Sequence, residues 1–327
     1  MPNWTENKIL FKSEDDCKKF TNVILDEKGN VDFGKIIPKP VYCDVTRSPA
    51  RKRDGIDAVF YLSRAGLGRD YRSIIRDADE KEIAGLISNV YRNDAKHAKY
   101  AAGVIVTLMC EDEPFPHDED GDILKEWKEN KPYVFENPSS IEDESGTWFI
   151  PEDVAKDDTL MASYLNGRAV TYLLAVHGAA NWYDWSVRNW GVKWNACETY
   201  AYDDEVSFMT PWCEPDHEII REAVRRAGVT CIWAYDEEQV TELFGYELFV
   251  NGELYDFNTH EGSQLTKDEV FFLADFFGTG DIITWDEANY CCVARYGDFY
   301  DEEEAEKVFD SLPAPENGAV WREWESI

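Results

Sequence analysis

The most regular pattern of strands and helices lies in residues 197–235, which read CETYAYDDEVSFMTPWCEPDHEIIREAVRRAGVTCIWAY. Two runs of alternating apolar and polar residues are joined by Asp203 and Asp204, and this arrangement predicts a tight β-hairpin. The segment EPDHEIIREAVRRAG predicts a helix that ends at Gly228, because its apolar residues recur at helical spacing. VTCIWAY predicts another strand. The order is therefore strand, strand, helix, strand.

The N-terminal residues supply a strand and a helix that complete this unit. NKILFK, residues 7–12, alternates as a strand does, and SEDDCKKFTNVIL begins a helix with Ser13 as its cap and Asp16 in the capping-box position. The combined order βαββαβ is the split arrangement of ferredoxin-like sandwiches. We therefore predict an α+β protein: a split ferredoxin-like βαββαβ sandwich with a large, mainly helical insertion after its first helix.

Three regions follow from this assignment. We expect the ferredoxin-like core in residues 1–33 and 181–260, and a mainly helical insertion with an acidic loop in 34–180. Residues 261–327 form a C-terminal αβ extension in this scheme. It follows a β-hairpin that the Asn251-Gly252 pair predicts, because these two residues accept the positive φ angles of a two-residue turn.

The insertion combines helical periodicity with an irregular stretch. Apolar residues between 54 and 110 fall at helical spacing, most clearly at Ile83, Leu86, Ile87, Val90 and Tyr91. Residues 111–156 are proline-rich, acidic and aperiodic, so we predict a long loop with little regular structure there. A second long helix is expected from Asp158 to His177, ended by Gly178.

Four tryptophans stand close together in NWYDWSVRNWGVKWN, residues 181–195. Asn181 can cap a short helix here and Gly191 can end it. We expect Trp182, Trp185, Trp190 and Trp194 to pack as a structural aromatic cluster that closes the sandwich. A base-stacking platform is the alternative, but such platforms work with basic grooves, and Arg188 and Lys193 are the only nearby cations.

Charge is the extreme property of the composition: 33 basic residues against 66 acidic ones give a net charge of −33. Such a surface repels nucleic acid and anionic lipid. A folded monomer of this size exposes about 14,000 Å², so an even distribution gives about one net charge per 400 Å². Duplex DNA carries one per about 100 Å². The protein can imitate DNA only where its carboxylates cluster.

Three segments concentrate acidic residues: 111–122, 141–158 and 298–306, the first with seven acids in twelve residues. A solvated loop or a helix N-terminus is the ordinary explanation of each. The residues that we expect to contact a partner are Glu111, Asp112, Glu113, Asp118, Glu119, Asp120, Asp122, Glu142, Asp143, Glu144, Asp301, Glu302, Glu303 and Glu304.

Sequence signatures of catalysis and cofactor binding are missing. There is no C-x-x-C pair, H-x-x-x-H, phosphate-binding loop or G-x-S-x-G motif, so we nominate no catalytic residue, metal ligand or cofactor. DEDGD, residues 118–122, partly follows a calcium-binding loop, but Ile123 stands where that loop needs glycine. The basic run 46–55 could hold a phosphate or an acidic partner, or could be a solvated loop.

Several segments resemble the YubB-type ferredoxin-like proteins of phages and plasmids. They are MPNW.EN.I.F (1–11), F.KIIPKP (33–40), WYDWSVRNWGVKWNA (182–196), F.TPW..P (208–215) and AYDEE (234–238). That family often has cysteine where this chain has Thr5 and Ser186, so no cysteine role transfers. The resemblance implies an α+β fold and residence on a mobile genetic element. It implies no activity.

These observations favour an acidic, non-enzymatic binding protein of a phage or related element. We expect it in the bacterial cytoplasm, because neither a signal peptide nor a membrane span is evident. Its expected partner is a host protein with a basic nucleic-acid-binding cleft, such as a restriction, CRISPR or other nuclease-type defence complex. We expect no direct contact with nucleic acid or membrane. Steric capture by a homo-oligomer, and a metal-dependent nucleotide or phosphodiester hydrolase, are the alternatives.

Overall fold

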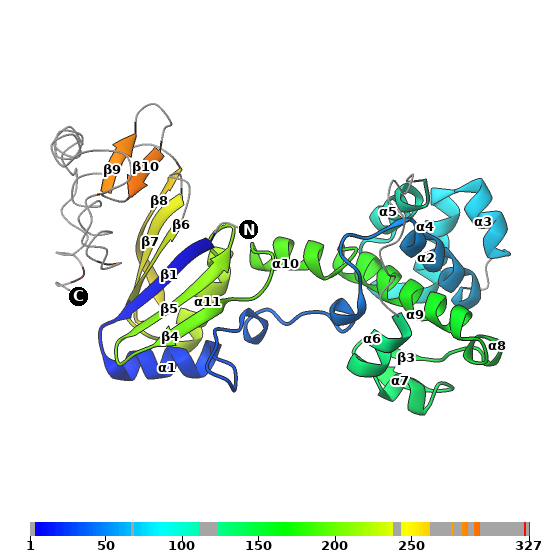
Figure 1. Ribbon diagram of the computed structural model, residues 1–327, viewed down its shortest axis with the longest axis horizontal. Coiled ribbons are helices and arrows are strands. Elements are labelled where there is room, and N and C mark those ends of the chain that lie inside the picture. The colour runs from blue at the N-terminus through cyan, green and yellow to red at the C-terminus, as the bar shows by residue number, and fades with distance from the viewer. Residues whose placement is uncertain are drawn as a thin grey trace. The chain divides into compact units, whose positions relative to one another are not determined.

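The computed structural model describes residues 4–66, 69–110, 123–237 and 243–261, together with 276, 283–286, 291–294, 324 and 327 (Figure 1). The chain divides into two compact units. Unit 1 comprises Met1–Pro38 and Val187–Ile327, and unit 2 comprises Lys39–Ser186. These boundaries lie a few residues C-terminal to those expected for the insertion.

Unit 1 contains a six-stranded antiparallel sheet in the order β4-β5-β1-β6-β7-β8 (Figure 1). The predicted hairpins at Asp203-Asp204 and Asn251-Gly252 are confirmed, and the second has φ angles of 51° and 88°. The strands of the sheet are β1 (Trp4–Phe11), β4 (Cys197–Ala201), β5 (Glu205–Pro211), β6 (Cys231–Glu237), β7 (Leu243–Val250) and β8 (Glu253–Glu261). Mixed helix and antiparallel sheet confirm the α+β class.

Two helices, α1 (Glu14–Ile24) and α11 (His217–Ala227), cover one face of this sheet. Ser13 caps α1 by accepting a hydrogen bond from the Asp16 N–H, and Gly228 ends α11 in the left-handed conformation, both as predicted. Alternate residues of β1 are buried, and the Phe11 and Phe20 rings lie 5.2 Å apart. The apolar side of each helix therefore meets the buried side of the sheet.

A charged cluster crosses this helix–sheet interface. The Glu247 carboxylate, on β7, is completely buried and lies 2.6 Å from the His217 ring nitrogen at the start of α11. Arg221, one turn further along α11, forms a second ion pair with the same carboxylate. Burial favours the neutral ring, but the contacts with Glu214 and Glu247 outweigh it and raise the pKa of His217 to about 9. The imidazolium therefore fastens α11 to the sheet.

This cluster predicts that stability depends on pH above neutrality. Because the folded pKa of His217 lies above the ordinary 6.5, its stabilisation is complete below that pH and is lost as pH rises through about 9. We expect a loss of about 3 kcal/mol in the free energy of unfolding. His217→Gln should remove most of this dependence in urea titrations, whereas His97→Gln, at an exposed histidine, should keep it. An unchanged profile in His217→Gln would contradict the assignment.

Unit 2 is mainly helical. Its helices are α2 (Lys52–Ala65), α3 (Tyr71–Asp77), α4 (Glu80–Tyr91), α5 (Ala98–Cys110), α6 (Ile123–Asn130), α7 (Tyr133–Glu136), α8 (Glu152–Ala155) and α9 (Asp158–Tyr172), which continues as a π-helical turn, η4 (Leu173–His177). A short hairpin, β2 (Ile141–Asp143) with β3 (Gly146–Trp148), lies between α7 and α8. As expected, Ile83, Leu86, Ile87 and Tyr91 form the buried side of α4.

Helix α2 packs against both α9 and α5, and two glycines allow the close approach. A Cβ atom at Gly167 would lie 2.0 Å from the Asp57 carbonyl oxygen, and one at Gly55 would lie 3.0 Å from three atoms of α5. The first distance is far below van der Waals contact. The close packing of α2 against α9 therefore requires glycine at position 167.

Gly167→Ala should consequently destabilise unit 2. The added methyl group must push α9 from α2, and overpacking of this kind costs about 1–3 kcal/mol or more. Gly85, on α4, is the matched control, because a Cβ there meets no atom within 4 Å. Gly85→Ala should leave the melting temperature unchanged or raise it. Equal melting temperatures for the two alanine variants would show that the α2–α9 contact is not tight.

One sequence prediction was wrong. Residues 111–156 were expected to form an irregular loop, but the described part, 123–156, contains α6, α7, α8 and the β2–β3 hairpin. These elements are too short to give a clear helical or strand pattern in the sequence. Tertiary contacts stabilise them instead, since Leu124 and Trp127 of α6 are buried. Most of the αβ extension expected in residues 261–327 lies outside the described residues, but the described part contains a second hairpin, β9 (Ile283–Asp286) with β10 (Cys291–Ala294).

Candidate functional site

The acidic segment 141–158 is the only one of the three whose structure is described. It begins with the β2–β3 hairpin, whose turn residues are Glu144 and Ser145. Gly146 follows with φ of 94°, a conformation that favours glycine, so the sequence permits the tight return of the chain. The chain then runs through α8 to Asp157, which caps α9 by accepting hydrogen bonds from the Thr159 and Leu160 N–H groups.

A buried cation holds this hairpin. Arg168, on α9, is 4% exposed, and its guanidinium lies 4.0 Å from the centre of the Trp148 ring. It donates hydrogen bonds to the Tyr42 hydroxyl at 2.9 Å and the Tyr61 hydroxyl at 2.7 Å, and also to the Ser145 hydroxyl. Burying a charge is costly unless it is stacked and hydrogen-bonded, and this guanidinium is both.

Two of these hydroxyls connect Arg168 to the carboxylate of Asp143. Tyr42 donates to one Asp143 oxygen at 2.8 Å, and Ser145 donates to the other at 2.5 Å. The Trp148 indole N–H adds a third hydrogen bond at 3.0 Å. Burial opposes ionisation of Asp143, but these hydrogen bonds outweigh it and hold its pKa below the ordinary value. Asp143 is therefore an ionised anchor for the hairpin.

This arrangement bears on the role expected for Asp143, which stays a prediction. Its carboxylate is half-buried and already accepts hydrogen bonds from Tyr42, Ser145 and Trp148. The neighbours Glu142 and Glu144 are exposed, as was expected of partner-binding residues. Further exposed acids of the segment are Glu152, Asp153, Asp157 and Asp158.

Some of these exposed acids form ion pairs with lysine or arginine side chains of the same protein, and others do not. Glu152 pairs with Lys156 at 2.5 Å and Asp153 with Arg64 at 2.8 Å. Within the described residues, Glu142, Glu144 and Asp158 form no ion pair. Phe149, between the hairpin and α8, is 59% exposed, which is high for an aromatic side chain. We call Glu142, Glu144, Asp158 and Phe149 the acidic rim.

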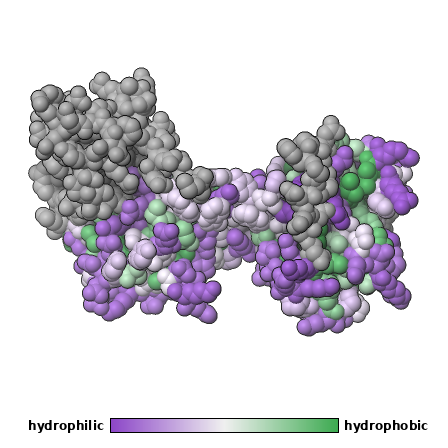
Figure 2. Space-filling model, in the orientation of Figure 1, coloured by the Kyte–Doolittle hydropathy of each residue, from purple (hydrophilic) through white to green (hydrophobic). Residues whose placement is uncertain are grey.

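The other predicted contact residues are not described. Glu111, Asp112, Glu113, Asp118, Glu119, Asp120 and Asp122, and likewise Asp301, Glu302, Glu303 and Glu304, lie outside the described residues. Their roles stay predictions. Hydrophilic residues cover much of the described surface on the face shown in Figure 2.

The four tryptophans do not all belong to unit 1. Helix α10 (Trp182–Trp190), capped by Asn181 as predicted, crosses the boundary between the two units. Trp182 and Trp185 belong to unit 2, whereas Trp190 and Trp194 belong to unit 1 and contact the Phe33 and Trp4 rings. Trp185 and Trp190 are buried and the other two are half-buried. Core packing is confirmed for that buried pair, whereas the expected closing of a ferredoxin-like sandwich by all four rings stays a prediction.

Sequence reasoning missed Arg168 and its hydroxyl partners. One signal could have found it: Arg168 is the only cation in α9, at a position where the helical pattern predicts burial. A buried arginine needs several acceptors, yet nothing in the sequence identifies Tyr42, more than a hundred residues away, as one of them.

Comparisons with known proteins do not assign the chain to a family. No family model matches it, and no curated protein does. Among solved structures, protein Api92 from Yersinia pseudotuberculosis, described as DUF1281, is 11% identical over 81% of this chain and all of that one, with a TM-score of 0.31. A likeness this weak carries no argument. The resemblance to YubB-type proteins stays a prediction.

Two further findings concern the described part of the chain. No helix there is long and apolar enough to cross a membrane. The same residues contain no group of three or more histidine, cysteine, aspartate or glutamate side chains placed to hold a metal ion.

The Arg168 network predicts that its removal destabilises unit 2. Arg168→Met leaves the Asp143 carboxylate without its cation, and breaking one side of a buried charge network costs about 3 kcal/mol. Arg64→Met is the control, because Arg64 and Asp153 are both exposed and such pairs contribute at most about 1 kcal/mol. Thermal unfolding should therefore show a large decrease only for Arg168→Met. Equal, small decreases would mean that the hairpin is not anchored by this residue.

Proposed function

We propose that this chain is a phage- or mobile-element-encoded binding protein that occupies the basic nucleic-acid-binding cleft of a host protein in the bacterial cytoplasm. A restriction, CRISPR or other nuclease-type defence complex has a cleft of this kind. The observation that carries the proposal is the acidic rim: exposed carboxylates that form no ion pair among the described residues, in one segment with an exposed aromatic ring. Glu142 and Glu144 belong to the hairpin that the buried Arg168 holds, and Phe149 and Asp158 follow it in the chain.

Electrostatics supports contact through this rim. A cluster of like charges on an acidic protein accelerates association with a basic cleft, and the attraction falls as salt screens it. The anchored hairpin fixes the backbone before binding, so less conformational entropy is lost when the partner arrives. Phe149 provides an apolar contact that can be buried among the charges, which is how interface hot spots are commonly built.

The proposal includes a ferredoxin-like scaffold for unit 1. Support comes from the strand order β4-β5-β1-β6 with α1 and α11 on one face, which is the order expected of a split βαββαβ sandwich. Strands β7 and β8 then extend that sheet at the β6 edge. The scaffold itself suggests no chemistry, because folds of this kind host many functions.

Competition with DNA tests the function. Purified restriction and CRISPR effector complexes would be loaded with fluorescently labelled duplex DNA, and displacement by this protein followed at increasing salt. We expect displacement by the wild type that weakens as salt rises. The triple variant Glu142→Gln, Glu144→Gln, Asp158→Asn should bind about tenfold more weakly, because three charge contacts together supply roughly 1.4 kcal/mol.

A second triple variant separates the rim from net charge. Glu198, Asp203 and Asp204 are exposed acids on the β4–β5 hairpin of unit 1, and neutralising them changes the net charge equally. We expect that variant to displace DNA like the wild type. Equal weakening by both triple variants would assign binding to overall charge and not to the rim.

Two other results would favour the alternative functions. Inhibition that does not depend on salt would favour steric capture, and metal-dependent nucleotide turnover would favour a hydrolase.

A further inference from the structure

Two acidic side chains are buried together where helix α2 meets α9. Asp54 and Asp57 lie one turn apart on α2 and are 1% and 3% exposed. The side-chain amide of Asn166, on α9, donates a hydrogen bond to each of them, at 2.8 Å to Asp54 and at 2.9 Å to Asp57. One neutral amide group therefore serves two acidic groups across the helix–helix interface. Neither acid has a part in the proposed contact through the acidic rim.

Asp54 also caps its own helix. Its second oxygen accepts a hydrogen bond from the Arg51 N–H at 2.7 Å, at the N-terminal end of α2. The N–H groups of a first helical turn have no partner within the helix, and the helix dipole favours negative charge there. A carboxylate suits this position, and its charge acts on the neighbouring Asp57.

Asp57 lies further inside the helix and has less compensation. Arg53 Nε lies 3.7 Å from its carboxylate, but the Arg53 side chain is 35% exposed, so water weakens the attraction. Burial raises the pKa of Asp57 to about 6, and the charge of Asp54 adds to this effect. Hydrogen bonds with Asn166 and Ser163 and the charge of Arg53 act to lower the pKa, but burial outweighs them. The carboxyl group therefore takes up a proton as pH falls through about 6.

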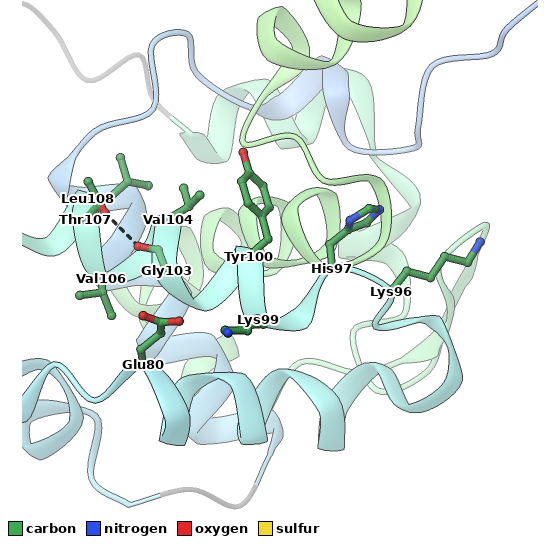
Figure 3. Close-up of a pocket in the computed structure, with 10 residues that line it drawn as sticks. All are labelled: Glu80, Lys96, His97, Lys99, Tyr100, Gly103, Val104, Val106, Thr107 and Leu108. Atoms are coloured by element: carbon green, nitrogen blue, oxygen red, sulfur yellow. Dashed lines mark hydrogen bonds between the residues drawn. The ribbon is translucent and has the colours of Figure 1, made fainter.

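The other helices that pack against α2 bring no second buried charge to Asp57. Helices α3, α4 and α5 carry no buried charged side chain among their described residues. Two of these charged residues, Glu80 and Lys99, line an open pocket beside α5 (Figure 3). Arg168 of α9 is buried, but its guanidinium donates to hydroxyl groups around the acidic hairpin. The remaining charged residues of these helices and of α2 are exposed or half-buried: Lys52, Arg64, Arg72, Arg76, Asp77, Lys81, Glu82 and Asp158.

Asn166 begins a run of three residues through which α9 contacts its neighbours. Gly167 lies against the Asp57 backbone, since a Cβ atom there would lie 2.0 Å from the Asp57 carbonyl oxygen, and Arg168 anchors the acidic hairpin. Asn166 Oδ1 is buried without a hydrogen-bond partner among the described residues. The amide cannot rotate to satisfy this oxygen while both acids are charged, because its N–H groups would turn away from them.

We propose that the cluster of Asp54, Asn166 and Asp57 is a pH-sensitive switch: a proton on Asp57 strengthens the contact between α2 and α9 and so stabilises unit 2 in mild acid. A neutral Asp57 still accepts the hydrogen bond from Asn166, but the repulsion by Asp54 and the cost of burying a second charge are removed.

The direction of the effect follows from the titration of Asp57. Because its folded pKa lies above the ordinary 3.8, the stabilisation is complete below that pH and is lost as pH rises through about 6. Carboxylates held in ion pairs behave in the opposite way, since their contribution to stability is lost in acid. The two kinds of acid can therefore be distinguished by the sign of the pH dependence.

Hydrogen exchange of the full chain at pH 5 and pH 7.5 tests the switch. Protection factors of the α9 amides, corrected for the intrinsic effect of pH, report the stability of this helix. The gain in protection on acidification should be about tenfold larger in the wild type than in Asp57→Asn, in which position 57 stays neutral. Glu136→Gln, at an exposed acid of α7, should behave like the wild type. Equal gains in the wild type and Asp57→Asn overturn the proposal.

The pH at which Asp57 titrates gives a second test, which does not require Asp57→Asn to fold and which a purely structural role would not satisfy. Carbon NMR of the Asp57 carboxyl group should show a midpoint near 6. Arg53→Met removes the cation 3.7 Å away and should raise this midpoint by about half a pH unit. Lys52→Met makes the same charge change at the neighbouring position and should move it less. A wild-type midpoint near 3.8, or equal shifts in the two methionine variants, overturns the proposal.

Discussion

Arg168 is a cation buried among hydroxyl groups and aromatic rings, and the position of the acidic hairpin depends on it. Among the described residues, no carboxylate contacts the guanidinium directly. The Tyr42 and Ser145 hydroxyls accept hydrogen bonds from it and donate hydrogen bonds to Asp143. Each hydroxyl serves as acceptor and donor at once, so every member of the network is held by two others. A network satisfied in this way orders the chain around it, and an incomplete one would be costly.

The charges of this protein therefore serve two purposes that composition alone does not separate. The half-buried Asp143 and the fully buried Glu247 have pKa values below their ordinary values, because hydrogen bonds within the protein outweigh burial, and Arg168 and the pair His217 and Arg221 are the nearby cations. Glu142 and Glu144 stand beside Asp143 in the sequence and remain exposed. Of these three adjacent acids, Asp143 therefore stabilises the hairpin, whereas Glu142 and Glu144 are the ones available to a partner.

Local patterns predicted the elements of unit 1 well. Ser13, Gly228 and the Asn251-Gly252 turn mark their ends by backbone chemistry that needs no distant contact. The failures arose where distant residues decide the outcome. The hairpin at residues 141–148 was missed because Arg168 and Tyr42 stabilise it from other parts of the chain, and α10 was assigned wholly to the sandwich because periodicity does not reveal where one unit ends. Asp143 was counted with its neighbours because all three residues have the same local character.

Hydrogen exchange of the backbone amides in residues 141–150 tests most directly whether the acidic hairpin is a fixed structure. The Ser145 N–H donates to Asp143 at 2.9 Å, and the Ile150 N–H donates to the Pro138 carbonyl at 2.7 Å. Both amides should exchange as slowly as those in the middle of α9, because opening the hairpin breaks the Arg168 network. Exchange at the rate of an unstructured peptide, while α9 stays protected, would contradict a prearranged acidic surface.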